Sequence, residues 1–195
     1  KQKMYGMSGP DFGILLDNML VPAGAAVKVS NLSNTRIEPE FAFELGEPLT
    51  GPGITVEQVL AATAKIWAAV EVIDSRVGAM RAGATDSIAD NAGAGKLVLG
   101  TVSLGPSDFD LVNTTIEVTV DGETQSGISG DVMGHPAAPV AWLANRLSEI
   151  GDLGESIKAG DIVISGSSTK SMAVAAGSRL HASFGSLGTM DIEFE

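Results

Sequence analysis

The chain has 195 residues, of which 44% are hydrophobic and 18% are charged. This length is enough for one substantial core, and we expect a single domain over residues 1–195. The formal net charge of −12 argues against binding to nucleic acid or to anionic lipid. Cysteine is absent, which excludes disulfides and zinc–thiolate sites and fits a cytoplasmic protein. No apolar run approaches the roughly 18–20 residues that span a bilayer.

The first 35 residues are expected to form loops and short irregular elements around an apolar patch at 12–20. This patch is a candidate contact in a homo-oligomer. Asp11 lies in the segment Gly-Pro-Asp-Phe-Gly at 9–13, where the ordinary interpretation is a turn residue that caps its own backbone.

Residues 36–46 are predicted to form a strand with one acidic face. Side chains alternate along a strand, so Glu38, Glu40, Ala42 and Glu44 share one face, and the apolar residues between them share the other. A Glu-x-Glu pair alone is more typical of a solvent-facing strand. The pair therefore becomes informative only with a third acid.

Helical spacing of apolar residues predicts a helix over 55–67, which Thr55 and Gln58 can begin with a capping box. The chain then turns β-rich, and Glu71 lies between Val70 and Val72, where an ionised group is costly to bury without compensation. A third carboxylate makes a hard divalent cation plausible, because Mg²⁺ and Mn²⁺ prefer oxygen ligands. A purely structural calcium site stays open as an alternative.

The remainder is predicted to be mainly β. We expect a loop at 76–96, with the small residues at 78–85 lying over a site, and an ion pair between Asp74 and Arg76. Further expectations are a helix at 136–150, which His135 caps, and strands or hairpins at 97–99, 115–125, 161–164, 179–184 and 189–194. His181 is expected to be exposed. Neither a nucleophile elbow nor a phosphate loop is present.

Six segments, in this order, resemble the 2-keto-4-pentenoate hydratase and 4-oxalocrotonate decarboxylase group of the fumarylacetoacetate hydrolase superfamily. They are Pro-Asp-Phe-Gly at 10–13, Arg-Ile-Glu-Pro-Glu at 36–40, Val-Glu-Val-Ile-Asp-Ser-Arg at 70–76, Asp-Ser-Ile-Ala-Asp-Asn-Ala at 86–92, Gly-His-Pro at 134–136 with Val-Ala-Trp-Leu-Ala at 140–144, and Gly-Asp-Ile-Val-Ile-Ser-Gly at 160–166.

The resemblance implies an α+β, mainly β fold of bent mixed sheets rolled around a central metal site, with flanking helices. It implies Mg²⁺ or Mn²⁺ held by Glu38, Glu40 and Glu71, and it places Asp11 beside the substrate as a general acid or base. It also implies substrate contacts, which fall on Asn91, Ser167 and Thr169.

Two departures from the family pattern stand out. The resemblance implies an N-terminal helical region and an active-site lysine in a Lys-x-Gly-Leu-Thr segment upstream of Asp11, and the 195 residues contain neither. Either this chain is a truncated form or that segment is disordered, and we favour disorder, because loss of a catalytic lysine would silence the enzyme. Gly93 stands where the family usually has serine, which removes one hydroxyl that could orient substrate.

The implied function is a metal-dependent hydratase that converts 2-hydroxypenta-2,4-dienoate into a 4-hydroxy-2-oxo acid during meta-cleavage of aromatic compounds. Decarboxylation of 4-oxalocrotonate is the alternative, because stabilised negative charge on the 2-oxygen serves both reactions. A decarboxylase should offer a cation to the distal carboxylate, for which Arg81 and Lys96 are candidates, although each is more simply a solvated charge. A metal-stabilised scaffold that binds a 2-oxo acid without turnover is a third possibility.

Overall fold

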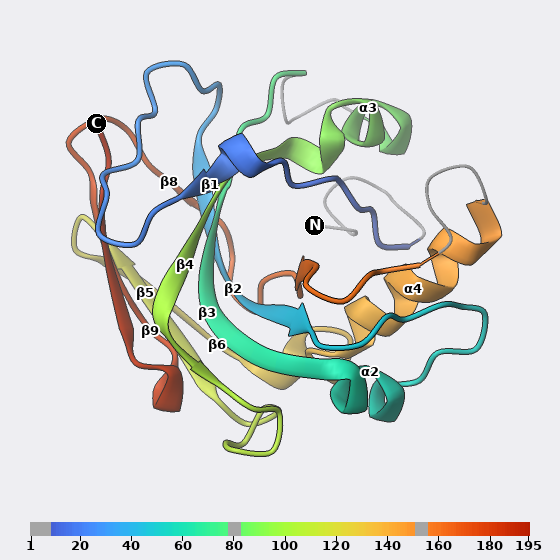
Figure 1. Cartoon of the computed structure of the whole chain (residues 1–195). Coiled ribbons are helices and arrows are strands. Elements are labelled where there is room, and N and C mark those ends of the chain that lie inside the picture. Colours follow the sequence, from blue (N-terminus) through green and yellow to red (C-terminus); the bar gives the residue numbers. More distant parts are fainter. Residues whose placement is uncertain (1–8, 78–82, 151–155) are drawn as a thin grey trace.

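The computed structural model describes residues 9–77, 83–150 and 156–195, and Figure 1 shows the arrangement of its elements. The larger sheet has six strands in the order β1 (Leu20–Val21), β4 (Ala94–Leu104), β3 (Thr63–Ile73), β2 (Arg36–Leu45) and β7 (Ile162–Ile164), with β8 (Met172–Ala173) paired to β2 beyond this path. The two long central strands, β2 and β3, are antiparallel, and β1 runs parallel to β4.

The smaller sheet has four antiparallel strands in the order β10 (Thr189–Glu193), β9 (Arg179–Ser183), β5 (Thr115–Val120) and β6 (Glu123–Ile128). β5 and β6 form the predicted hairpin. Its two turn residues, Asp121 and Gly122, have φ angles of 49° and 90°. Positive φ at both central positions matches the right-handed twist of the strands, which is why Asp-Gly predicts this turn so well.

The main hydrophobic core lies between the two sheets. Alternate residues of β2 and β3, including Ile37, Phe41 and Val70, pack in one cluster with Val118 and Ile192 of the smaller sheet. Because side chains alternate along a strand, about half of those on each central strand point into this core. The other face of the larger sheet is left for the glutamates, and Figure 1 shows it turned toward α3, α4 and the residues that precede β1.

Three α-helices are present in the described ranges: α2 (Val56–Ala62), α3 (Ala84–Ala89) and α4 (Ala138–Ile150). Short 3₁₀ turns are η1 (Asp17–Met19), η2 (Asn91–Gly93), η3 (Ser129–Asp131) and η4 (Gly185–Leu187). His135 precedes α4 as expected, and its Nδ1 accepts a hydrogen bond of 3.0 Å from the backbone N–H of Ala137. No helix within the described ranges is long and apolar enough to cross a membrane.

The helix predicted over 55–67 is wrong in its second half. The capping box forms as expected between Thr55 and Gln58. The helix ends at Ala62, and Thr63 begins β3, which pairs along its whole length with β2. Apolar residues at helical spacing also satisfy one face of this strand, and β-branched and aromatic residues favour the extended form once a neighbouring strand is available.

The loop predicted at 76–96 is also wrong in part. It contains α3 and η2, and β4 begins at Ala94 and runs to Leu104, well beyond the short strand predicted at 97–99. A helix of only six residues offers too few turns for a periodic pattern to be recognised. The central part of the predicted covering loop, 78–82, lies outside the described residues, as does Arg81.

Candidate metal centre

The strand pairing of β2 with β3 places three glutamates together on the face away from the main core. Glu38 lies directly opposite Glu71 in the ladder, and Glu40 lies opposite Ala69. Directly opposed side chains in an antiparallel pair have Cβ atoms about 4.5–5.5 Å apart. The register thus brings acids that are 31 to 33 positions apart in the sequence onto one patch of sheet.

One carboxylate oxygen from each of Glu38, Glu40 and Glu71 can be chosen so that all three oxygens lie within 4.8 Å of one another. Glu40 is only 2% exposed, and the other two side chains are half-buried. The predicted acidic face of the strand is therefore present, but the solvent-facing interpretation of the Glu-x-Glu pair does not hold, because Glu40 is enclosed.

The loop that follows β7 contributes to this enclosure. The backbone N–H of Gly166 donates a hydrogen bond of 2.7 Å to Oε2 of Glu40. Gly166 has φ +83°, a left-handed conformation that favours glycine. This hydrogen bond fixes the orientation of the Glu40 side chain beside the other two glutamates.

This donor set fits a hard divalent cation. Three carboxylate oxygens at this separation, held on adjacent strands, match the oxygen ligation and partial coordination typical of Mg²⁺ and Mn²⁺. Three like charges this close repel one another, and a bound cation would reverse the local sign of the potential. The separation of the three carboxylate oxygens is therefore the observation that favours a bound divalent cation.

Beyond the glutamates, the same sheet face becomes apolar. A small cluster of buried residues forms it, separate from the main core: Ala42, Ala69 and Leu97, with the partly buried Leu15, Trp67, Leu99, Ile162 and Ile164 packed against them. We call these eight residues the apolar floor. Ala69 and Leu97 each stand opposite one of the glutamates in the ladder, so the floor begins directly beside the carboxylates.

A polar group stands at the far end of the apolar floor. Oε2 of Glu44 accepts a hydrogen bond of 2.9 Å from Nε1 of Trp67, and Lys65 lies 3.7 Å from Oε1 of Glu44. The Lys65 ammonium also lies over the Trp67 ring, 5.6 Å from its centroid. The side chain of Lys65 is half exposed, so its attraction to Glu44 is weakened by solvent.

Asp11 lies on the segment that precedes β1, with its side chain half-buried. Its Oδ2 accepts a hydrogen bond of 2.7 Å from Oγ of Ser87 in α3. The next residue, Phe12, makes an edge-on contact with Trp142 of α4, with ring centroids 6.2 Å apart. Asp11 is therefore a residue of tertiary contact rather than one that only caps its own turn.

Asn91, Ser167 and Thr169 were the predicted substrate residues. Both ends of the Asn91 amide bond the backbone of Ile14, at 2.7 Å and 2.8 Å. The hydroxyls of Ser167 and Thr169 lie 3.2 Å apart, in the loop just beyond Gly166. Ser167 and Thr169 thus belong to the loop that contacts Glu40. Asn91 instead contacts the segment that precedes β1, through the backbone of Ile14.

Arg76 forms the predicted ion pair with Asp74, at 3.3 Å, and a shorter one that we did not predict, at 2.6 Å to Asp90. Sequence patterns miss Asp90 because 14 residues separate it from Arg76 and no period links them. Lys96, one of the two candidate cations for a distal carboxylate, donates instead to the backbone carbonyl of Asn18 at 2.8 Å. His181 is exposed and pairs with Asp191.

The family model described as fumarylacetoacetate (FAA) hydrolase C-terminal matches residues 7–194. The chain is 40% identical over 196 residues to a 2-hydroxyhexa-2,4-dienoate hydratase of Comamonas testosteroni, and 35% identical over 195 residues to a 4-oxalocrotonate decarboxylase of Pseudomonas sp. strain CF600. These alignments cover 99% and 100% of this chain and 73% of each relative. The chain belongs to the fumarylacetoacetate hydrolase family.

Solved structures agree with this assignment. A 4-oxalocrotonate decarboxylase from Pseudomonas putida G7, complexed with magnesium and adipate, superimposes with a TM-score of 0.93 at 32% identity, over 100% of this chain and 73% of that one. The same protein complexed with calcium and acetate gives a TM-score of 0.91. The predicted fold is confirmed, and magnesium is the cofactor that these findings support.

Proposed function

We propose that this protein is a metal-dependent hydratase that adds water to a 2-hydroxy-2,4-dienoate such as 2-hydroxypenta-2,4-dienoate, giving a 4-hydroxy-2-oxo acid. The observation that carries the proposal is the trio of glutamate oxygens within 4.8 Å, on a sheet face that continues directly into the apolar floor. Carboxylates would hold the cation at one end, and an apolar surface would receive an uncharged hydrocarbon tail at the other.

Glu38, Glu40 and Glu71 are the proposed ligands of Mg²⁺ or Mn²⁺. When bound, the cation supplies Lewis-acid stabilisation of negative charge on the carboxylate and 2-oxygen of the substrate. The residues contribute preorganisation: Glu38 and Glu71 are fixed by the ladder of β2 and β3, and Glu40 is fixed by the Gly166 N–H. Ligands on rigid strands need little rearrangement to bind the ion.

Asp11 is the proposed general acid or base. It would hold a proton, or orient the attacking water, on the side of the site formed by the segment before β1, with Ser87 fixing its carboxylate. Ser167 and Thr169 are proposed to donate to the substrate carboxylate from the loop beside Glu40. Asn91 is proposed to shape the substrate side of the site.

The apolar floor is the reason to prefer hydration over decarboxylation. A distal carboxylate that lay along this face would lose solvent over aliphatic side chains and would then approach Glu44, a like charge. Burial of an ionised carboxylate without a partner is strongly unfavourable. An uncharged vinyl or alkyl tail meets neither cost.

A 4-oxalocrotonate decarboxylase is the second candidate. The solved decarboxylase with a TM-score of 0.93 was complexed with adipate, a dicarboxylate, together with magnesium. Lys65 lies 3.7 Å from Glu44 at the end of the apolar floor, and it could turn toward a distal carboxylate. This candidate uses the same metal ligands and differs at the far end of the substrate.

Kinetics with both substrates separate the candidates. The full-length protein is incubated with Mg²⁺ and 2-hydroxypenta-2,4-dienoate, with loss of dienol absorbance as the readout, and in parallel with 4-oxalocrotonate, with release of carbon dioxide as the readout. We expect the higher kcat/KM with the dienoate. Preference for 4-oxalocrotonate would establish the decarboxylase, and no turnover of either would leave only a binding scaffold.

The proposed setting is cytoplasmic breakdown of aromatic compounds by meta-cleavage, because the relatives include enzymes named for such dienoates. We also propose a homo-oligomer. Ile14, Leu16 and Leu20 in the early apolar patch are 57%, 54% and 49% exposed, which is the kind of surface that association buries. Size-exclusion chromatography with light scattering tests this proposal.

A further inference from the structure

We propose that Asn91 is a positioning residue, which docks the segment before β1 against η2 and so places Asp11 for its acid–base role. The inference rests on the proposed function, because it concerns the delivery of a residue to that same site. Asn91 then acts indirectly, through the backbone of Ile14, and Arg76 anchors the whole arrangement.

The side-chain amide of Asn91 makes the two backbone hydrogen bonds that a neighbouring strand would otherwise make to Ile14. Its Oδ1 accepts from the Ile14 N–H at 2.7 Å, and its Nδ2 donates to the Ile14 carbonyl at 2.8 Å. Both backbone groups of one residue are thereby satisfied by one side chain, as they would be in an antiparallel ladder. Such a two-point contact sets the position and the direction of the segment.

The segment is shaped to accept this contact. A Cβ atom at Gly13 would collide with the backbone carbonyl of Asn91, so only glycine allows the two chains to approach this closely. Two residues before Gly13, Asp11 accepts a hydrogen bond from the Ser87 hydroxyl, and Phe12 contacts Trp142. The Asn91 contact is therefore the last of three attachments along four consecutive residues.

Strain at η2 also points to a positioning role. Asn91 and Ala92 both have φ 56°, and Gly93 has φ 79°. Left-handed backbone is uncommon at a residue with a Cβ, although asparagine adopts it more readily than most, and two such residues in succession are rarer still. Such strain persists only where surrounding contacts hold it in place.

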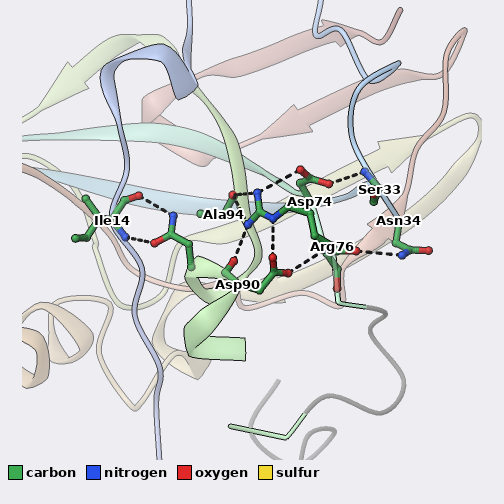
Figure 2. Close-up of polar contacts among 9 residues, drawn as sticks. Ile14, Ser33, Asn34, Asp74, Arg76, Asp90 and Ala94 are labelled. Atoms are coloured by element: carbon green, nitrogen blue, oxygen red, sulfur yellow. Dashed lines mark hydrogen bonds and ion pairs between the residues drawn. The ribbon is translucent and has the colours of Figure 1, made fainter. Parts of the chain in front are cut away.

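Arg76 supplies those contacts, as Figure 2 shows. Its side chain lies between the Asp74 and Asp90 carboxylates, at 3.3 Å and 2.6 Å, and it also donates to the Asp90 carbonyl at 2.6 Å. Its own backbone N–H donates to Oδ2 of Asp90 at 2.9 Å. Both aspartates are buried, so the guanidinium fork fixes the residue that immediately precedes Asn91.

The connection runs from the metal strand to the acid–base residue. Arg76 follows Glu71 by five positions on the chain leaving β3, Asp90 and Asn91 form the turn, and Ile14 lies three residues after Asp11. One end of this chain of contacts is thus fixed relative to a proposed metal ligand. The other end determines where the Asp11 carboxylate can lie.

Asn91→Gly is the sharpest test, because glycine accepts φ 56° and removes only the amide. Ala92→Gly is the matched control, since it relieves the same backbone strain at the adjacent position and leaves the contact intact. For Asn91→Gly we expect kcat with the preferred substrate to fall about 10- to 100-fold, because an error of about 1 Å in placement can cost this much. KM and Mn²⁺ affinity, measured by electron paramagnetic resonance, should stay within about two-fold of the parent. Ala92→Gly should behave as the parent.

A second readout follows the segment itself. In a Trp67→Phe background, Trp142 is the sole tryptophan, and Phe12 contacts it. We expect Asn91→Gly to increase acrylamide quenching of Trp142, and Arg76→Lys to do the same, because lysine keeps the charge and loses the fork. Asn91→Gly melting near the parent temperature would exclude a general loss of structure.

Three results would overturn the inference. These are an unchanged kcat in Asn91→Gly, a lowered kcat with unchanged Trp142 quenching, or a raised KM with unchanged kcat, the last of which indicates a direct substrate contact. In each case the parent enzyme is active, so the proposed function survives. If the parent itself turns over neither substrate, the proposed function fails, and the quenching result alone decides whether Asn91 docks the segment.

Discussion

Glu38 and Glu71 stand directly opposite each other in the ladder of β2 and β3, on the face of the sheet away from the main core. Like charges in this relationship destabilise an antiparallel pair. A cation between them converts the repulsion into attraction, so the same pair that weakens the metal-free sheet should strengthen the loaded one. The stability of this protein should therefore depend on divalent metal.

Mg²⁺ or Mn²⁺ is expected to raise the melting temperature, and EDTA to lower it. At a hundred-fold excess of metal over Kd, binding to the native state adds about 2.7 kcal/mol. For a chain of this size, that corresponds to roughly 5–10 °C. Differential scanning calorimetry across a metal titration measures the shift.

Glu71→Gln should abolish this metal-dependent shift while the metal-free protein stays folded. Glu44→Gln is the matched control, because Glu44 lies on the same face of the sheet but outside the trio of glutamates. It should keep the shift. A full shift in Glu71→Gln would show that the ion binds elsewhere.

Asp11→Asn should lower kcat about 10²- to 10⁴-fold, the usual contribution of a positioned acid or base. The amide keeps the shape of the side chain and can still accept a hydrogen bond from Ser87. The fall in kcat would therefore report the loss of the ionisable carboxylate alone. Mn²⁺ affinity should be unchanged. Asp17→Asn, an exposed acid on the same early segment, serves as the control and should have parental kinetics.

Glu44→Gln should relax discrimination against substrates that carry a distal carboxylate. Removal of one like charge at the end of the apolar floor is worth on the order of 1 kcal/mol, or about five-fold in relative kcat/KM. The measurement is the ratio of kcat/KM values for 4-oxalocrotonate and 2-hydroxypenta-2,4-dienoate. Glu117→Gln, on the exposed side of β5, makes the same change in net charge, and an equal change in the ratio there would reject a local effect.

His135 should make stability fall as the pH falls from about 7.5 to 5.5. Burial lowers the pKa of His135, and the nearby Glu57 carboxylate opposes this only in part. The unfolded chain then binds more protons than the native one near the ordinary histidine pKa of about 6.5, so stability is present above that pH and is lost below it. Protonation also removes the lone pair that accepts the Ala137 N–H.

His135→Asn should flatten this dependence, because asparagine retains a capping oxygen but does not titrate. Melting temperatures at several pH values in the presence of saturating Mg²⁺ provide the measurement. His181→Asn is the control, because it changes the other histidine, which is exposed and pairs with Asp191. A melting profile for His135→Asn that is as steep as that of the parent would contradict the assignment.

The alternation of β2 could be predicted from the sequence because a strand shows its two faces directly. The burial of Glu40 could not, since it depends on Gly166, which is 126 positions away. The extension of β3 back to Thr63 is not predictable from the sequence for a related reason. Helical and extended spacing coincide over those residues, and the edge of β2 decides between them.

The role of Asn91 shows another limit. A family pattern can mark the residue as part of the site, but its amide is engaged with the backbone of Ile14, 77 positions away. Asp90 is a similar case: the sequence predicts the pair of Arg76 with the nearer Asp74, which forms, but it does not predict the second pair with Asp90. Contacts of this kind depend on where the turn at 91–93 comes to lie, which local sequence does not specify.

All three glutamates belong to two adjacent strands in the middle of the larger sheet, whereas Asp11, Asn91, Ser167 and Thr169 belong to segments outside that pair. The proposed metal ligands and most of the proposed substrate-facing groups therefore lie on separate parts of the chain, with the Gly166 loop as a point where they meet. Substitutions in the covering segments could redirect the reaction without rebuilding the carboxylates. A hydratase and a decarboxylase at 40% and 35% identity to this chain are what such a division would produce.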